Sequence, residues 1–102
     1  MDVVIDIQGF RGSDKQFIVK ELAALSVDNT LRAHWMFLPP THWNQLSNDA
    51  KKQAQWLTNH HHQLGWEDGN IPYYKLACIL QSVSSLASTI TVKGEEIGRA
   101  HV

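Results

Sequence analysis

The sequence has almost no cysteine, no long apolar run and no surplus of basic charge. Cys78 is the only cysteine among 102 residues, which excludes an intrachain disulfide and a multi-thiolate zinc site and fits a reducing compartment. The apolar runs fall far short of the roughly 20 residues that cross a bilayer. The first residues also lack the basic start of a secretory signal. These absences predict an intracellular protein, cytoplasmic or nuclear, with no membrane partner.

Charge and composition predict one folded domain. Lys and Arg number 9 against 10 Asp and Glu, and no basic tract is present to hold phosphates without sequence preference. The chain is 43% hydrophobic and 19% charged, which is typical of a globular chain and not of a disordered one. We therefore expect residues 1–95 to form a single domain. The 4 Trp are the one unusual count in so short a chain.

Hydrophobic periodicity predicts an alternation of strands and helices. Strands are expected over residues 3–8, 16–25, 31–38 and 88–93, and helices over 48–60 and about 71–85. Gly9 and the residues after it supply a turn, so the first two strands form an antiparallel hairpin. Pro39 and Pro40 end the third strand because proline cannot donate to a ladder. The order β-β-β-α-α-β predicts an α/β fold, a mixed sheet covered by helices.

Local signals fix the first helix and suggest which side chains it buries. Ser47 is the expected N-cap, and Leu46, Ala50, Ala54 and Leu57 recur at helical spacing. Trp56 is expected on the apolar side of this helix. In the second helix, Tyr73, Leu76, Leu80, Val83 and Ala87 trace one face, and Cys78 is interpreted as a small core residue.

The first strand carries the pattern closest to a catalytic motif. Asp6 and Gln8 lie on one face, whereas Ile5 and Ile7 lie on the other. The run V-I-D-I-Q-G-F over 4–10 resembles the opening motif of the DEDD exonucleases of the ribonuclease H-like fold, in which a hydrophobic strand carries Asp-x-Glu. That fold also begins with three antiparallel strands and returns through a helix to a parallel strand beside the first. Residues 3–10 with 17–23, 56–68 and 90–95 are similar to degenerate exonuclease-like domains of uncharacterised, mobile-element-type eukaryotic reading frames.

The resemblance implies a truncated ribonuclease H-like mixed sheet with Asp6 as its catalytic and metal-ligating position, for Mg²⁺ or Mn²⁺. Gln8 replaces the glutamate, and an amide lacks the negative charge that a hard cation requires. We therefore expect Asp6 to be vestigial and the domain to be non-catalytic, with nucleic acid or protein as its partner. The alternatives are a small protein–protein interaction module and a metal-dependent 3′–5′ exonuclease in the full-length chain. The alternative interpretation of Asp6 itself is an ordinary solvent-facing carboxylate on a strand.

Two other groups carry possible chemistry. His60, His61 and His62 are metal-ligand types, and with His34 and Cys78 they are similar to the zinc-bearing Maelstrom domain, but their spacing favours a solvated helix end near the C-terminal dipole. The aromatic residues could stack nucleic-acid bases or pack in the core, and core packing is favoured because basic residues do not alternate with them. They are Trp35, Trp43, Trp56, Trp66, Tyr73 and Tyr74.

The last residues fit no expected element. Residues 97–102 can be encoded by bases that resemble a common sequencing-library adapter read in frame. We interpret 96–102 as a non-native tail on a truncated domain, with natural sequence ending near Glu95. The alternative is a genuine frayed terminus. No function is assigned to Arg99 or His101.

Overall fold

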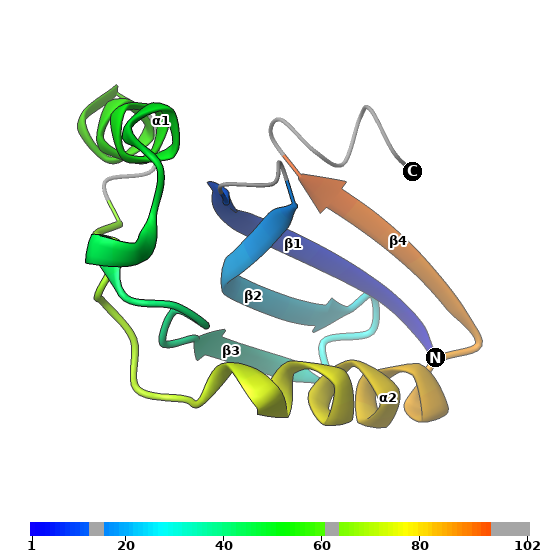
Figure 1. The fold of residues 1–102 in the computed structure, drawn as a ribbon. Helices are drawn as coiled ribbons and strands as arrows, with labels where there is room; N and C mark the ends of the chain where they lie inside the picture. Colours follow the sequence, from blue (N-terminus) through cyan, green and yellow to red (C-terminus); the bar gives the residue numbers. More distant parts are fainter. Residues whose placement is uncertain (13–15, 61–63, 95–102) are drawn as a thin grey trace.

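The computed structural model describes residues 1–12, 16–60 and 64–94. Its elements are β1 (Asp2–Arg11), β2 (Phe17–Ser26), β3 (Arg32–Met36), α1 (Asn48–His60), α2 (Leu76–Leu86) and β4 (Thr89–Gly94), with short 3-10 turns at Trp43–Gln45 and Tyr73–Lys75 (Figure 1). The predicted order β-β-β-α-α-β is confirmed. Part of the predicted turn after Gly9, His61, His62 and the predicted non-native tail over 96–102 lie outside the described residues. No helix in the described ranges is long and apolar enough to cross a bilayer.

The strands form one mixed sheet in the order β3-β2-β1-β4. β1 pairs antiparallel with β2 and parallel with β4, and β2 pairs antiparallel with β3. The predicted hairpin and mixed sheet are therefore confirmed, and β1 lies between two partners. In register, Asp6 is opposite Ala23 of β2 on one side and Lys93 of β4 on the other.

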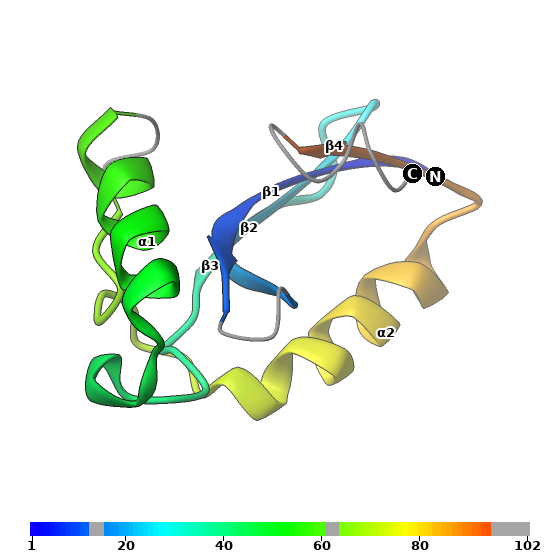
Figure 2. The same cartoon turned by 45° about the horizontal axis from the view of Figure 1, so that its top comes forward.

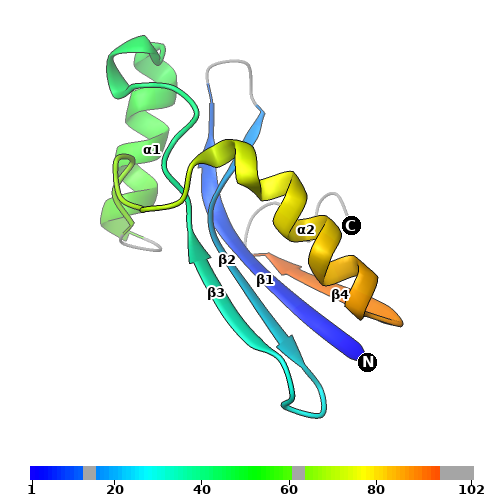
Figure 3. The same cartoon turned by 90° about the horizontal axis from the view of Figure 1, so that it is seen from below.

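α2 covers one face of this sheet (Figures 2 and 3). The core beneath it contains the buried residues Val3, Ile5, Leu22, Ala24, Phe37 and Val83. Every residue predicted for the apolar face of this helix packs here, which confirms the helical spacing. The helix itself begins later than expected, at Leu76, because residues 73–75 take the tighter 3-10 geometry.

The strand β1 is longer than predicted, because Gly9 continues it and does not end it. A bulge between Gln8 and Gly9 shifts the register with β2. A Cβ at Gly9 would collide with the Ile18 carbonyl, so the close approach of the two backbones requires glycine. Beyond the bulge, Phe10 packs into a second core against α1. That core is formed by Phe10, Ile18, Leu46, Ala50, Ala54 and Trp66.

α1 matches its predicted bounds, but Trp56 lies on its exposed side and not on its apolar side. The Ala50 amide donates to Ser47 Oγ at 3.2 Å, which confirms the N-cap. Ala50 and Ala54 are buried, whereas Trp56 is 56% exposed and stacks on His60 with ring centroids 5.1 Å apart. The prediction for Trp56 was wrong because the two alanines turn the opposite face of α1 to the sheet.

Two further predictions needed correction. Cys78 is exposed and is not a core residue, since the apolar face of α2 runs through other positions. β3 ends at Met36 and not at Leu38, because Phe37 forms an isolated bridge with Ile71 from a distant loop.

A hydrogen-bonded turn joins β2 to β3. Asp28 accepts bonds from Ser26 Oγ at 2.7 Å and from the Thr30 hydroxyl and amide at 2.7 and 3.1 Å. These bonds favour the charged carboxylate and lower the pKa of Asp28 to about 2. Asn29 adopts a positive φ of 63°, which asparagine tolerates. The turn thus sets the register in which β3 leaves β2.

Candidate functional site

The candidate site is the sheet face opposite α2, at the middle of β1. We refer to this side of the sheet as the open face. Asp6 is exposed on this face, whereas its neighbour Ile5 is only 4% exposed and packs under α2. The predicted alternation of Asp6 and Gln8 against the isoleucines is confirmed at these positions. The one carboxylate of the motif is therefore exposed near the middle of β1, on the sheet face opposite α2 (Figure 3).

A row of side chains crosses this face through Asp6. The strand registers place Lys93, Asp6, Ala23 and His34 side by side on four adjacent strands. Residues in register on neighbouring strands share a face, and opposite charges there attract. Lys93 therefore brings a positive charge next to Asp6 at the place where the exonuclease resemblance expects the second acidic motif to begin. This charge opposes the binding of a divalent cation.

The next row contains Gln8, which stands at the glutamate position of the Asp-x-Glu motif that β1 resembles. Gln8 is opposite Glu21, whose Oε2 lies 2.5 Å from His34 Nε2. Gln8 Oε1 is buried and has no hydrogen-bond partner among the described residues. The Glu21 carboxylate is thus bonded to a histidine, and the side chain beside it is a neutral amide whose Oε1 has no partner among the described residues.

These residues do not fit a divalent metal. Within residues 1–12, 16–60 and 64–94, no three His, Cys, Asp or Glu side chains come together to hold an ion. The neighbours of Asp6 on this face include Lys93, in register on β4, and the amide of Gln8, two residues further along β1. Two-metal sites for Mg²⁺ hold the ions through carboxylates together with waters and substrate phosphates, whereas this row offers one carboxylate beside a lysine. Of the acidic positions that the resemblance implies for Mg²⁺ or Mn²⁺, the described residues therefore supply Asp6.

Lys20 is the residue that the sequence pattern failed to indicate. It is 1% exposed, and its Nζ donates to the carbonyl oxygens of Phe37 at 2.9 Å, Trp66 at 2.7 Å and Asp68. Burial lowers the pKa of Lys20 to about 8, and the carboxylates of Asp68 and Glu67 oppose this shift. We refer to the carbonyl groups of Phe37, Trp66 and Asp68 as the carbonyl cage. The cage joins β2 to two distant loops, so Lys20 has a structural role.

The aromatic residues do not form a single stacking surface. Trp66 is buried and makes ring contacts with Phe10 and Trp43, at centroid distances of 5.4 and 6.2 Å. Tyr73 packs edge-on against Phe37 at 6.2 Å. Trp56 and Tyr74 are the members of the predicted set with large exposed side chains. Core packing, the favoured interpretation, accounts for the buried members.

The histidines are also separated. His60 lies in the last turn of α1, where its Nδ1 is 3.1 Å from the Trp56 carbonyl oxygen. His34 is on the open face, whereas Cys78 lines a groove beside α2 on the other side of the sheet. These described members of the proposed zinc set therefore do not converge.

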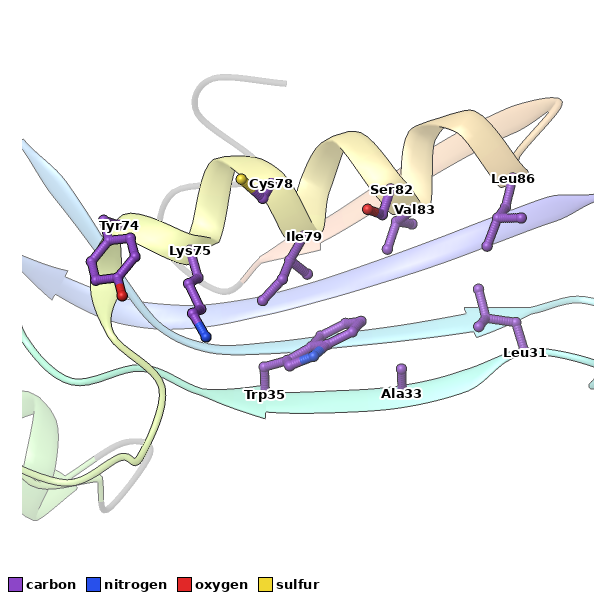
Figure 4. A pocket seen from close by; sticks show the side chains of 10 residues that line it. All are labelled: Leu31, Ala33, Trp35, Tyr74, Lys75, Cys78, Ile79, Ser82, Val83 and Leu86. Atoms are coloured by element: carbon purple, nitrogen blue, oxygen red, sulfur yellow. The ribbon is translucent and has the colours of Figure 1, made fainter.

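That groove lies between β3 and α2 and has a volume of about 540 Å³. Figure 4 shows Trp35, Leu31 and Ala33 of β3 and the preceding turn facing Ile79, Val83 and Leu86 of α2 across it. Tyr74, Lys75, Cys78 and Ser82 complete the lining. The sequence pattern did not reveal the groove because it depends on the angle at which α2 crosses the sheet.

The comparisons with known proteins give no relative. No family model, no curated protein and no solved structure matches the chain. The functional argument therefore depends on the open face and the groove.

Proposed function

We propose that this chain is a degenerate, ribonuclease H-like domain of the DEDD exonuclease type that acts by binding nucleic acid or protein and does not cleave phosphodiesters. The sheet order supports this proposal, since two antiparallel strands on one side of β1 and a parallel strand on the other match the start of that fold. The motif strand β1 lies between β2 and β4, and Asp6 is exposed on the face opposite α2.

The environment of Asp6 is the observation that carries the non-catalytic part. Two-metal phosphoryl transfer requires carboxylates that converge on a pair of cations. Here the neighbours of Asp6 are Lys93 in register on β4 and Gln8 on its own strand. One carboxylate beside a lysine cannot hold two divalent ions against a phosphate.

A nuclease assay on the complete protein tests this proposal. We expect a 5′-labelled single-stranded oligonucleotide to remain intact with Mg²⁺ or Mn²⁺, and Asp6→Asn to behave like the wild type. Asp49→Asn, in the first turn of α1, is a matched control for the loss of one exposed carboxylate. Metal-dependent shortening from the 3′ end that Asp6→Asn removes and Asp49→Asn retains would establish a working exonuclease instead.

A specific observation also favours the second candidate, a small protein–protein interaction module. The groove beside β3 is lined mainly by apolar side chains, and Tyr74 and Leu86 at its margin are 77% and 56% exposed. Exposed apolar patches of this kind are typical of interaction surfaces. The two candidates are compatible, because the groove and Asp6 lie on opposite sides of the sheet.

A further inference from the structure

Within the part of the chain that the structure describes, β3 is an edge strand, and its outer side has backbone groups without a strand partner. Phe37 N donates to Lys20 O at 2.8 Å and Ser26 N donates to Leu31 O at 2.9 Å, so the odd-numbered residues of this segment bond to β2. Bonding direction alternates along an antiparallel strand. The N–H and C=O groups of Arg32 and His34 therefore point away from the sheet.

The adjoining part of this edge is already occupied by the chain itself. Met36 O accepts bonds from the amides of Asn70 and Ile71, both at 3.1 Å, and Leu38 N donates to Ile71 O at 2.8 Å. The free edge is thus limited to Arg32, Ala33 and His34. An exposed edge of this kind is a template for pairing with another strand.

The side chains beside the free edge are apolar on one face and polar on the other. Ala33 and Trp35 point into the groove next to α2 (Figure 4). Arg32 and His34 lie on the open face, where His34 contacts the Glu21 carboxylate. An added strand would therefore cover apolar surface on one side and meet charged groups on the other.

We propose that two copies of this chain pair through β3, antiparallel, about a two-fold axis at Ala33. This inference depends on the β3 edge and the groove. It does not depend on whether Asp6 is a degenerate metal position. Antiparallel pairing of the same edge in two copies is isologous, as closed dimers require. It joins the two sheets into one and brings the two grooves together across the axis.

Charge and space select this register. Outward-facing residues must pair with each other, so the axis can lie at Arg32, Ala33 or His34. An axis at Arg32 places two arginines directly opposite, which is destabilising. An axis at His34 places Arg32 of the second copy, the first residue of its β3, opposite Met36, whose outer side is occupied by Asn70 and Ile71. With an axis at Ala33 the residue opposite Met36 is Thr30, which precedes the strand.

The remaining axis, at Ala33, gives complementary contacts on both faces. Arg32 then lies beside His34 of the second copy, whose ring holds the Glu21 carboxylate. On the groove side, Leu31 lies beside Trp35 of the second copy. The positive charge of Arg32 thus meets a histidine–carboxylate pair, and the apolar groove residues cover each other.

Sedimentation equilibrium and light scattering test the pairing, with folding checked by circular dichroism. We expect the wild type at tens of micromolar to have twice the chain mass of 11.6 kDa. His34→Pro should be monomeric because it removes the outward N–H, a position where edge strands tolerate proline. His34→Thr also loses the contact with Glu21 but keeps the N–H, so it should dimerise more weakly than the wild type and more strongly than His34→Pro.

Disulfide trapping tests the register without relying on a destabilising variant. At an axis on Ala33 the two Cα atoms form a non-hydrogen-bonded pair about 4.5 Å apart, within the range of a disulfide, about 4.4–6.8 Å. In a Cys78→Ser background, Ala33→Cys should crosslink rapidly, whereas Ala77→Cys, exposed on α2, should not. A monomeric wild type, a dimeric His34→Pro, or crosslinking at 33 no faster than at 77 would overturn the proposal.

Discussion

Replacing Lys20 with methionine should lower the free energy of unfolding by about 3 kcal/mol or more. Methionine retains the length of the side chain but removes the ammonium group that bonds to Phe37 O, Trp66 O and Asp68 O. The carbonyls of the cage would then lose their buried donor. For a domain of this size, the midpoint of thermal unfolding should fall by roughly 12 °C.

Urea unfolding followed by tryptophan fluorescence measures this effect, since Trp66 itself contributes a carbonyl to the cage. Lys52→Met is the matched control, because Lys52 is exposed on α1 and its loss should change the unfolding free energy by less than about 0.5 kcal/mol. A Lys20→Met variant as stable as Lys52→Met would show that the cage does not contribute to stability.

Replacing Gly69 with alanine should be the second most destabilising change, by about 2 kcal/mol or more. Gly69 has a φ of 124°, a conformation that residues with a side chain rarely adopt. A Cβ there would also lie 2.5 Å from the Phe37 carbonyl carbon and 2.9 Å from Leu38 N. The Phe37 carbonyl belongs to the carbonyl cage. The substitution therefore has two effects, because it strains the loop and also displaces a hydrogen-bond acceptor of Lys20.

The same urea titration tests Gly69→Ala, with Gly65→Ala as its control. The nearest atoms to a Cβ at Gly65 belong to the Asp68 carboxylate, at 3.0 to 3.2 Å, and a side chain can move where a backbone cannot. The double variant Lys20→Met, Gly69→Ala should lose less stability than the sum of the single variants, because both act on one cage. Strict additivity would contradict this coupling.

Local pattern was sufficient for much of the fold. The helix predicted over about 48–60 is observed there, because an N-cap serine, an acidic residue in the first turn and apolar residues at helical spacing all agree. The placement of Asp6 and Gln8 on one face of β1 follows from strand alternation alone. These features depend on neighbours in sequence, which a single chain displays directly.

Other features depend on contacts between distant residues. Lys20 follows the same alternation as Ile18 and Leu22 and is buried like them, but its partners are carbonyls 17 to 48 residues further along the chain. A lysine in a strand normally indicates an exposed position. The alternation of buried and exposed residues along β2 was therefore the available signal that Lys20 is buried. The distant carbonyls that bond to its ammonium group could not be predicted from the sequence.

The candidate site shows the same division. The pairing of Asp6 with Gln8 on one face was evident from β1, but the neighbour Lys93 depends on the parallel register with β4. Trp56 and Cys78 were misplaced because the helices carry apolar residues on more than one side, and packing chose between them. The groove beside β3 arises from the crossing of α2 over the sheet, which no local pattern encodes.

Introducing acidic residues at positions 8 and 93 tests the central claim most directly. If Asp6 marks a degenerate metal position, Gln8→Glu together with Lys93→Asp should place carboxylates around it on one face. Electron paramagnetic resonance of Mn²⁺ would measure binding, and the further change Asp6→Asn is the control. We expect no binding by the wild type, binding by the double variant with a dissociation constant below roughly 1 mM, and its loss with Asp6→Asn. Mn²⁺ binding by the wild type at Asp6, or none by the double variant, would contradict the account.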